Sequence, residues 1–214
     1  MRPWRRSPSG ASPAQRLLEE LRPHIGNPRV LAAIEAVPRH RFVPEDRRGE
    51  AWDNVALPIG SGQTISQPLV VARMCELLEL RGDERVLDVG TGSGYHAAVL
   101  ARLVAHVWSV ELHPELSQRA AQRLASVGAG NVTLLVGDGA LGHPACAPYD
   151  AINVAAAMTA VPPALPAQLA PGGRLVGPVG EDQRLVLLHR GPGGELHREE
   201  HERVRFVPLV SGPE

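Results

Sequence analysis

The stretch VLDVGTGSGY, residues 86–95, constrains the fold of this chain more than any other feature. A short apolar segment leads into a loop, and an apolar helical segment follows at 96–104. The glycines of the loop alternate, at Gly90, Gly92 and Gly94. Glycine has no Cβ, so a ligand can touch the main chain, and the free N–H groups that open a helix suit an anionic group. The stretch therefore predicts the first strand, loop and helix of a ligand-binding βαβ unit.

The spacing of this loop argues against a dinucleotide ligand. Dinucleotide-binding loops follow Gly-x-Gly-x-x-Gly, whereas Tyr95 stands here at the position of the last glycine. Asp88 would disfavour a pyrophosphate and would suit an ammonium group. A ligand with an amino-acid end and a nucleoside end, such as S-adenosylmethionine, fits both features. The alternative is an ordinary strand-to-helix turn with extra glycines.

Acidic residues follow the next two expected strands. The segment 106–111 ends on Glu111, 21 residues beyond Gly90, which is about where a carboxylate meets ribose hydroxyls in nucleotide-binding sheets. An acid at a helix N-terminus is the alternative, because a helix is expected to begin at Pro114, and agreement with the glycine loop favours the ribose. Asp138 lies between two glycines after the strand 131–136 and would accept a hydrogen bond from the adenine amine. A plain turn aspartate is the alternative there.

The segment 51–68, AWDNVALPIGSGQTISQP, is predicted to be an irregular loop. It is too rich in glycine and proline for a regular element, and long loops inside a compact domain are usually functional. Its neutral polar side chains could hold a polar substrate: Gln63, Thr64, Ser66 and Gln67. Ser66 also precedes a helix expected at 69–80, so helix capping and substrate contact both stay open for it.

The remaining pattern predicts an α/β fold. We expect a Rossmann-like, doubly wound, mostly parallel sheet with an antiparallel C-terminal hairpin strand and an N-terminal helical cap. Two short amphipathic helices should lie between Ala14 and Pro38, and another should begin at Pro162–Pro163. The expected strands are 86–89, 106–111, 131–136, 149–154, 174–178, 184–189 and 203–210.

One domain is expected to span residues 14–214, after a disordered tail at 1–13. Within it, 14–80 should form the cap and substrate loop, and 81–214 the cofactor-binding core and C-terminal hairpin. The chain has 22 basic and 23 acidic residues and only 3% aromatic residues, which predicts no nucleic-acid partner. No apolar run suits a signal peptide or a membrane span. Cys75 and Cys146 belong to no CxxC pair, so we expect buried free thiols in a cytoplasmic monomer.

Two competing motifs carry less weight. HREEH, residues 197–201, fits the His-x-x-Glu-His pattern of a zinc peptidase family, but that chemistry needs both imidazoles on one face of a helix. This segment follows a glycine turn and leads into an expected strand, so we interpret it as a solvated charge cluster and expect no metal. The nucleophile elbow Gly-x-Ser-x-Gly is absent, because Thr91 stands where Ser93 would need the first glycine.

Taken together, these motifs resemble a known family. VLDVGTGSGY, Glu111 and the GDG at 137–139 resemble class I S-adenosylmethionine-dependent methyltransferases. LPIGSGQTISQP, with PRHRFVP near the start and VRFVPL near the end, resembles more specifically the protein-L-isoaspartate O-methyltransferases. The resemblance covers about Val30 to Leu209, and the loop ending in TISQP is its most specific part.

The resemblance implies a repair reaction. A methyl group would pass from S-adenosylmethionine to the free carboxylate of L-isoaspartyl residues in damaged proteins and peptides, giving an ester that closes to a succinimide, and S-adenosylhomocysteine. Ser66 takes the position of the active-site serine of the family. The substrate-binding positions would be Thr64, Ile65, Gln67 and Val207. The cofactor-binding positions would be Asp88, Gly90, Thr91, Gly92, Ser93, Gly94, Glu111, Leu112, Asp138 and Gly139.

Two departures from the family accompany this resemblance. Ala155 stands where these proteins often have a threonine, so any contact from that hydroxyl is missing, and Asp88 stands where many have glutamate. A methyltransferase of another carboxyl group or small molecule is the alternative enzyme, and a nucleotide-binding regulatory module without catalysis is the alternative of another class. An amine methyltransferase is disfavoured, because the fourth parallel strand runs into NVAAA rather than Asn/Asp-Pro-Pro-aromatic.

Overall fold

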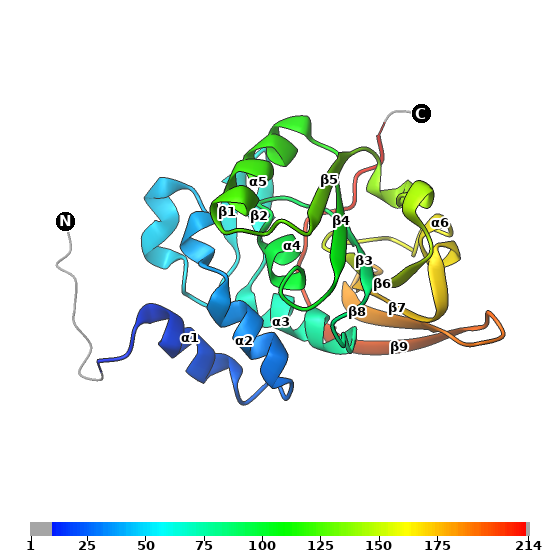
Figure 1. Ribbon diagram of the computed structural model, residues 1–214, viewed down its shortest axis with the longest axis horizontal. Coiled ribbons are helices and arrows are strands. Elements are labelled where there is room, and N and C mark those ends of the chain that lie inside the picture. Colours follow the sequence, from blue (N-terminus) through cyan, green and yellow to red (C-terminus); the bar gives the residue numbers. More distant parts are fainter. Residues whose placement is uncertain (1–9, 213–214) are drawn as a thin grey trace.

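The computed structural model describes residues 10–212, and its centre is a seven-stranded sheet (Figure 1). The strands lie in the order β5 (Val132–Val136), β4 (His106–Glu111), β3 (Arg85–Val89), β6 (Tyr149–Val154), β7 (Leu169–Val179), β8 (Arg184–Arg190) and β9 (Leu196–Arg203). The first five are parallel to one another, and β8 and β9 continue the sheet antiparallel. This confirms the expected mostly parallel sheet with an antiparallel C-terminal part.

Helices cover both faces of the sheet. They are α1 (Pro13–Leu21), α2 (Pro28–Ala36), α3 (Pro68–Leu77), α4 (Tyr95–Leu100), α5 (Pro114–Ser126) and α6 (Ala164–Ala167), with short 3-10 turns η1 (Arg39–Arg41), η2 (Glu45–Glu50), η3 (Gly139–Leu141) and η4 (Pro144–Cys146). Buried residues of α1 to α5 pack with Val86 on one face, and α6 packs with Leu87 on the other. Successive residues of a strand point to opposite faces, so apolar runs such as β3 feed both cores.

Local signals at the N-terminus set where the first helix begins. Ser12 and Gln15 form a capping box, with the Ser12 Oγ accepting from the Gln15 N–H at 3.2 Å, and Pro13 occupies the first helical turn. We expected the disordered tail to include residue 13, whereas α1 begins at Pro13. Residues 1–9 of that tail lie outside the described residues.

The expected irregular loop at 51–68 contains a small antiparallel hairpin, which corrects the prediction. Its strands are β1 (Leu57–Gly60) and β2 (Gln63–Ile65). The turn between them has a positive φ at each of Gly60, Ser61 and Gly62. Alternate residues of β1 are buried, as in any strand with one face on a core. Proline and glycine at the other positions concealed this period in the sequence.

The C-terminal hairpin also differs from the prediction. The last strand is β9, at Leu196–Arg203, and the segment 204–210 is outside the sheet except for an isolated bridge between Ala157 and Pro208. The sequence LHREEHER lacks apolar alternation because β9 is an exposed edge strand whose charged side chains face solvent on both sides. The expected strand at 174–178 is also longer, because β7 continues through a bulge at Pro171–Gly173.

The topology creates a crevice at the carboxyl edge of the sheet. The strands β3 and β6 are neighbours, but the chain leaves β3 toward β4 and leaves β6 toward β7, on opposite sides. Ligands of open α/β sheets bind where connections diverge in this way. The C-terminal segment crosses this edge, with the Leu209 N–H donating to the Ala157 carbonyl at 2.7 Å. Among the helices of residues 10–212, none combines the length and apolar character needed to span a bilayer.

Candidate functional site

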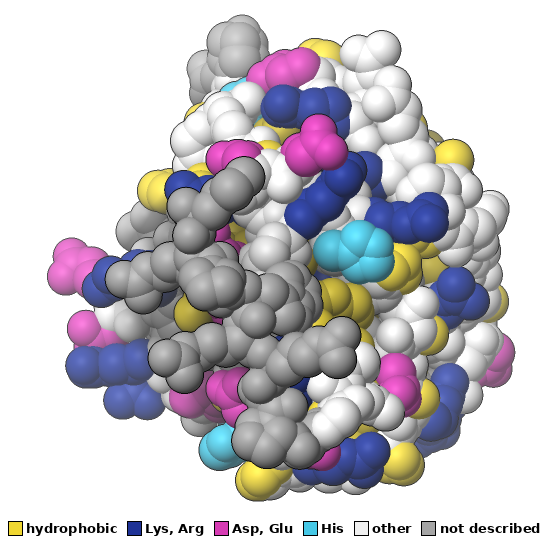
Figure 2. All heavy atoms as spheres, turned by 90° about the vertical axis from the view of Figure 1, so that its left-hand side faces the viewer, with side chains coloured by type: hydrophobic (Ala, Val, Ile, Leu, Met, Phe, Trp, Pro, Cys, Tyr) yellow, Lys and Arg dark blue, Asp and Glu magenta, His cyan; other side chains and the backbone are white. Residues whose placement is uncertain are grey.

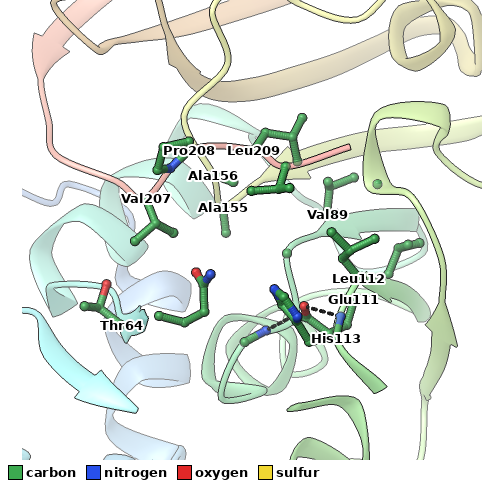
Figure 3. Close-up of a pocket in the computed structure, with 16 residues that line it drawn as sticks. Thr64, Val89, Glu111, Leu112, His113, Ala155, Ala156, Val207, Pro208 and Leu209 are labelled. Carbon is green, nitrogen blue, oxygen red and sulfur yellow. Dashed lines mark hydrogen bonds between the residues drawn. The ribbon is translucent and has the colours of Figure 1, made fainter. Parts of the chain in front are cut away.

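A cavity opens at this carboxyl edge, between the glycine loop and the C-terminal segment. Thr64 and Val207 lie on one side of it, and Glu111, Leu112 and His113 lie on the other (Figure 3). Further walls come from the ends of β3 and β4, from the loop after β6 and from the turn after β5. Parts of the chain that are far apart in sequence thus meet where the sheet topology predicts a ligand.

The glycine loop presents bare main chain to this cavity. Gly90, Gly92 and Gly94 all have positive φ, at 92°, 53° and 86°. Side chains are strained in that region of conformational space, and a Cβ at Gly94 would lie 3.2 Å from the Ala120 Cβ. Gly90 and Gly92 line the cavity directly. The positive φ angles thus account for glycine at all three positions, and two of the glycines leave bare main chain at the cavity.

Glu111 is held rigidly at the end of β4. Its side chain is 6% exposed and borders the cavity. One carboxylate oxygen accepts from the Gly92 N–H at 2.7 Å and the other from the His113 N–H at 3.0 Å (Figure 3). Each oxygen keeps a further lone pair for a hydroxyl donor. The acid in the first turn of α5 is Glu115 instead, so the arrangement favours the ribose interpretation, which stays a prediction.

The turn after β5 places Gly139 against the cavity and the Asp138 carboxylate beside it. The Asp138 Oδ1 accepts from the Ala140 N–H at 2.8 Å and its Oδ2 accepts from the Gly212 N–H at 3.2 Å. Asp138 therefore performs the turn role that was its alternative, and contact with a ligand would use its remaining lone pairs. Gly139 approaches β3 so closely that a Cβ there would lie 2.5 Å from the Val89 Cγ1.

The structure places Asp88 behind the glycine loop, outside the walls of the cavity. Its side chain is 0% exposed and accepts hydrogen bonds from Ser109 and Asn153, each at 2.7 Å. Burial raises the pKa of Asp88 to about 6, although both hydrogen bonds act in the opposite direction. The expected direct contact with an ammonium group is therefore not available in this arrangement. Asp88 can act on a ligand only through its charge.

Ser66 lies in a second cavity that adjoins the first. Thr64, Gly90, Gly92 and Ala155 line both cavities. Ser66 is half-buried, and the N-cap position of α3 belongs to Gln67, whose side chain makes no capping bond. The N-terminus of α3 is capped from a distance, because the Asn54 Oδ1 accepts from the Leu69 N–H at 3.0 Å. The capping alternative for Ser66 is therefore not observed.

The other predicted site residues have diverse positions. Ile65 is buried and lines the second cavity, and Val207 lines the first. Thr91 and Ser93 line the second cavity, but their hydroxyls also form hydrogen bonds, that of Thr91 with Ser109 of β4 and that of Ser93 with the Tyr95 N–H at the start of α4. Leu112 lines the first cavity. Gln67 is half-buried and borders neither cavity.

Sequence reasoning did not predict some residues of the site. His113 lines the first cavity and His96 lines the second, and neither was predicted. Pro208 and Leu209, which belong to the segment VRFVPL singled out in the sequence, also line the first cavity. Asn153 contacts Asp88 from the next strand, and one signal could have revealed it: an amide inside the otherwise apolar run AINV. The HREEH segment lies in the edge strand β9, so it lacks the helical geometry that the zinc peptidase pattern requires. Cys75 and Cys146 are both free thiols, and Cys75 is buried.

Comparisons with known proteins point to one family. The sequence profile of the protein-L-isoaspartate(D-aspartate) O-methyltransferase family matches residues 12–214. A protein-L-isoaspartate O-methyltransferase of Anaeromyxobacter dehalogenans is 56% identical over 196 residues, which cover 89% of this chain and 94% of that protein.

Solved structures share the fold. One, a protein-L-isoaspartate O-methyltransferase, has a TM-score of 0.85 at 27% identity, and the match covers 92% of this chain and 66% of that longer chain, just under two thirds. Another, a beta-aspartate methyltransferase of Plasmodium falciparum in complex with S-adenosyl-L-homocysteine, has a TM-score of 0.79 at 23% identity, covering 92% of this chain and 98% of that one.

Proposed function

Because the chain belongs to the protein-L-isoaspartate(D-aspartate) O-methyltransferase family, we propose that it methylates the free carboxylate of L-isoaspartyl residues in proteins and peptides. The methyl donor is S-adenosylmethionine, and the products are a methyl ester and S-adenosylhomocysteine. One observation carries the proposal: the cavity that contains Ser66 shares walls with the cavity of the glycine loop. A methyl acceptor in one would therefore adjoin a methyl donor in the other.

The residues that line the first cavity offer groups that suit S-adenosylmethionine. A Cβ at Gly92 would lie 3.6 Å from the Ile59 Cδ1, so any side chain there would narrow the space between loop and hairpin. The Gly90–Gly94 main chain would hold the amino-acid end, and Glu111 would accept from the ribose hydroxyls. Val89, Leu112 and Leu209 offer apolar surface near Gly139 for the adenine ring, with Asp138 beside it. When bound, the cofactor supplies an electrophilic methyl group on a sulfonium.

The protein needs no general base for this reaction. A carboxyl group has a pKa of about 4, so it is ionised at neutral pH and is already a nucleophile. The residues of the second cavity must instead orient it, and alignment can contribute on the order of several kcal/mol. The Ser66 hydroxyl would donate to one carboxylate oxygen and leave the other free to attack. A neutral donor orients the anion without stabilising its ground state as strongly as an arginine would.

The segment around these cavities would bind the peptide and limit water. Thr64, Ile65 and Gln67 follow β1 in the hairpin segment and would contact the substrate from one side, and Val207 of the C-terminal segment from the other. Thr91 and Ser93 would act mainly by fixing the loop, since their hydroxyls already bind Ser109 and the Tyr95 N–H. We thus assign substrate contact to the hairpin and C-terminal segments and structural support of the loop to the two hydroxyls.

The organisation that we propose is one domain at 14–214 that acts as a cytoplasmic monomer. Buried side chains of α1 and α2 share one core with α4 and with β3, which supports a single folding unit. Arginine and acidic side chains are intermixed on the visible part of the face in Figure 2, and an intermixed face supports a protein substrate more than a nucleic acid as the partner. The protein substrates are therefore its expected partners.

Paired peptides test the function directly. The full chain would be incubated with methyl-labelled S-adenosylmethionine and two peptides that differ only in an isoaspartyl or aspartyl linkage. We expect base-labile label on the isoaspartyl peptide alone. Equal label on both peptides, or on another small carboxylate only, would support the alternative methyltransferase. Binding of the cofactor without any transfer would support the regulatory module.

A further inference from the structure

A chain of buried polar side chains runs beneath the glycine loop. Its members come from five different elements and the loop itself, and each is at most 6% exposed. In order of contact they are Thr91, Ser109, Asp88, Asn153, His96 and Cys75. The contact distances are 2.7, 2.7, 2.7, 3.2 and 3.5 Å along that order. Among the described residues, every side-chain nitrogen and oxygen of this network except the buried Asn153 Oδ1 has a hydrogen-bond partner, and such satisfied groups help to specify one arrangement.

Asn153 stands at the middle of this chain and gives both amide hydrogens to it. Its Nδ2 lies 2.7 Å from the Asp88 Oδ1 and 3.2 Å from the His96 Nδ1. In the reverse amide orientation the Asn153 oxygen would face the Asp88 carboxylate. An ionised carboxylate can only accept hydrogen bonds, so these two acceptors could not pair. His96 therefore accepts at Nδ1 and carries its proton on Nε2, facing the Cys75 Sγ at 3.5 Å.

The other half of the chain has a fixed direction too. The Ser109 Oγ donates to the Asp88 Oδ2 at 2.7 Å, so Thr91 must donate its own hydroxyl hydrogen to Ser109. Thr91 lies in the glycine loop and His96 in the helix that follows it. The Asp88 carboxylate is thus the common acceptor of a network tied to both parts of the cofactor-binding motif.

We propose that Asn153 is a positioning residue for the cofactor: it holds Asp88 as an oriented anion behind the glycine loop, where that charge attracts the ammonium group of S-adenosylmethionine, which S-adenosylhomocysteine keeps. The inference rests on the proposed cofactor. A carboxylate in a low-dielectric interior acts over a longer distance than one in water, so direct contact is unnecessary. Without the amide donor, the buried carboxylate would take up a proton more readily and the attraction would disappear.

Other ionisable groups face Asp88 and set its background charge. Glu111 from β4 is a second anion that favours protonation of Asp88, and Cys75 from α3 and His96 from α4 lie along the network. Burial lowers the pKa of His96 to about 3 and raises that of Cys75 well above its usual value. Both are therefore neutral near neutral pH, which leaves Asn153 and Ser109 as the groups that stabilise the anion.

The test is the pH dependence of cofactor-product affinity. Calorimetry would measure the Kd of S-adenosylhomocysteine for the wild type, Asn153→Leu and Asn153→Ser from about pH 5.5 to about pH 9. We expect the Leu variant to bind at least ~10-fold more weakly than wild type near pH 6.5, and within ~3-fold near pH 9, because a shift of one pKa unit changes occupancy tenfold. The Ser variant, which can still donate, should lie between them.

A matched control is Asn131→Ala, because Asn131 is a partly buried amide that donates to three carbonyls away from the site. It should lower Tm without moving the pH midpoint. Parallel pH profiles for wild type and both Asn153 variants, or equal weakening at every pH, would overturn the inference while leaving the function intact. If Asn153→Leu does not fold, an unchanged midpoint in Asn153→Ser overturns it. A wild type that fails to bind S-adenosylhomocysteine would instead contradict the proposed function.

Discussion

The side chain of Gln183 holds the backbone of Phe206 by both of its polar groups. The Gln183 Oε1 accepts from the Phe206 N–H at 2.7 Å, and its Nε2 donates to the Phe206 carbonyl at 3.3 Å. Gln183 itself has a φ of 47° in the turn between β7 and β8. This contact fixes the start of the C-terminal segment, whose residues 207–210 then cover the first cavity.

Removing this clamp should loosen the cover of the site. In Gln183→Ala two partly buried hydrogen bonds are lost, which corresponds to about 1–3 kcal/mol. We expect kcat/KM for an isoaspartyl peptide to fall about 10-fold and S-adenosylhomocysteine to bind more weakly, by steady-state kinetics and calorimetry. Glu181→Ala, an exposed residue of the same turn, is the control and should change neither. Unchanged kinetics in Gln183→Ala would show that the segment is held by other contacts.

Ser66 should matter for methyl transfer and little for the cofactor. In Ser66→Ala the hydroxyl that would orient the substrate is lost, so the methylation rate should fall by about 10- to 100-fold. The Kd of S-adenosylhomocysteine should stay within about 3-fold, since Ser66 lines only the second cavity. Ser126→Ala at the end of α5, whose hydroxyl donates to the Arg123 carbonyl, is the control. Full turnover of the Ser66→Ala variant would show that the Ser66 hydroxyl has no role in the reaction.

Glu111 should contribute to cofactor affinity through the carboxylate lone pairs that its two backbone partners leave free for the ribose hydroxyls. Glu111→Gln keeps the size of the side chain but removes the charge, and its NH2 group can no longer accept from one of the two backbone N–H groups of Gly92 and His113. Charge-assisted hydrogen bonds are worth about 1.5–3 kcal/mol. We expect S-adenosylmethionine to bind about 10- to 100-fold more weakly by calorimetry. Glu115→Gln, the exposed acid in the first turn of α5, should bind normally. Equal affinity in both variants would refute the ribose assignment.

Asp88 and His96 should give opposite slopes of stability against pH. The folded state holds the Asp88 proton more tightly than the unfolded chain, because its pKa is raised to about 6 from 3.8 by burial. Its contribution is thus present at low pH and is lost as the pH rises through about 6. Burial lowers the pKa of His96 from 6.5 to about 3, so its contribution is full above about pH 6.5 and is lost as the pH falls.

The two slopes partly cancel between about pH 4 and pH 6, and single variants separate them. Between about pH 7 and pH 5, Asp88 should add about 1 kcal/mol and His96 should remove about 2 kcal/mol. His96→Gln should therefore tolerate acid better than wild type in thermal unfolding, and Asp88→Asn should tolerate it less. His24→Gln, an exposed histidine, is the control. Identical slopes in the two site variants would contradict the buried network as the cause.

The parts of the fold that could be predicted from the sequence are those with a local signal. The strand β3 and the glycine loop were recognisable because apolar runs and positive-φ glycines are properties of neighbouring residues. The strand β9 was not, because an exposed edge strand needs no apolar alternation. The hairpin β1–β2 was hidden for a similar reason, since only Leu57, Ile59 and Ile65 mark its buried face.

The site residues also differ in whether a local signal or a long-range contact fixes their position. Glu111 was placed correctly because the end of a strand fixes its position, whereas the burial of Asp88 depends on partners from other strands. Asn153 meets Asp88 only because β3 and β6 are neighbours with those two residues in register. Sheet order and register are long-range properties, so sequence reasoning could identify Asp88 as an acid of the site but not what surrounds it.

The close contact between Gly139 and Val89 allows a final prediction in which one change should rescue another. Gly139→Ala would place a Cβ 2.5 Å from the Val89 Cγ1, and overpacking of this kind costs about 1–3 kcal/mol. Because φ at Gly139 is not positive, the overlap is the only source of strain, and the turn with Asp138 must shift to relieve it.

The double variant Gly139→Ala/Val89→Ala removes the branch that causes the overlap. A double-mutant cycle on the free energy of unfolding and on the free energy of S-adenosylhomocysteine binding should therefore give a favourable coupling of about 1–2 kcal/mol. Val89→Ala alone supplies the cost of the lost apolar contact, and Gly137→Ala is the control, since a Cβ there meets nothing within 4 Å. Additive effects would mean that Gly139 is required for close approach of the ligand to its backbone rather than for packing against β3.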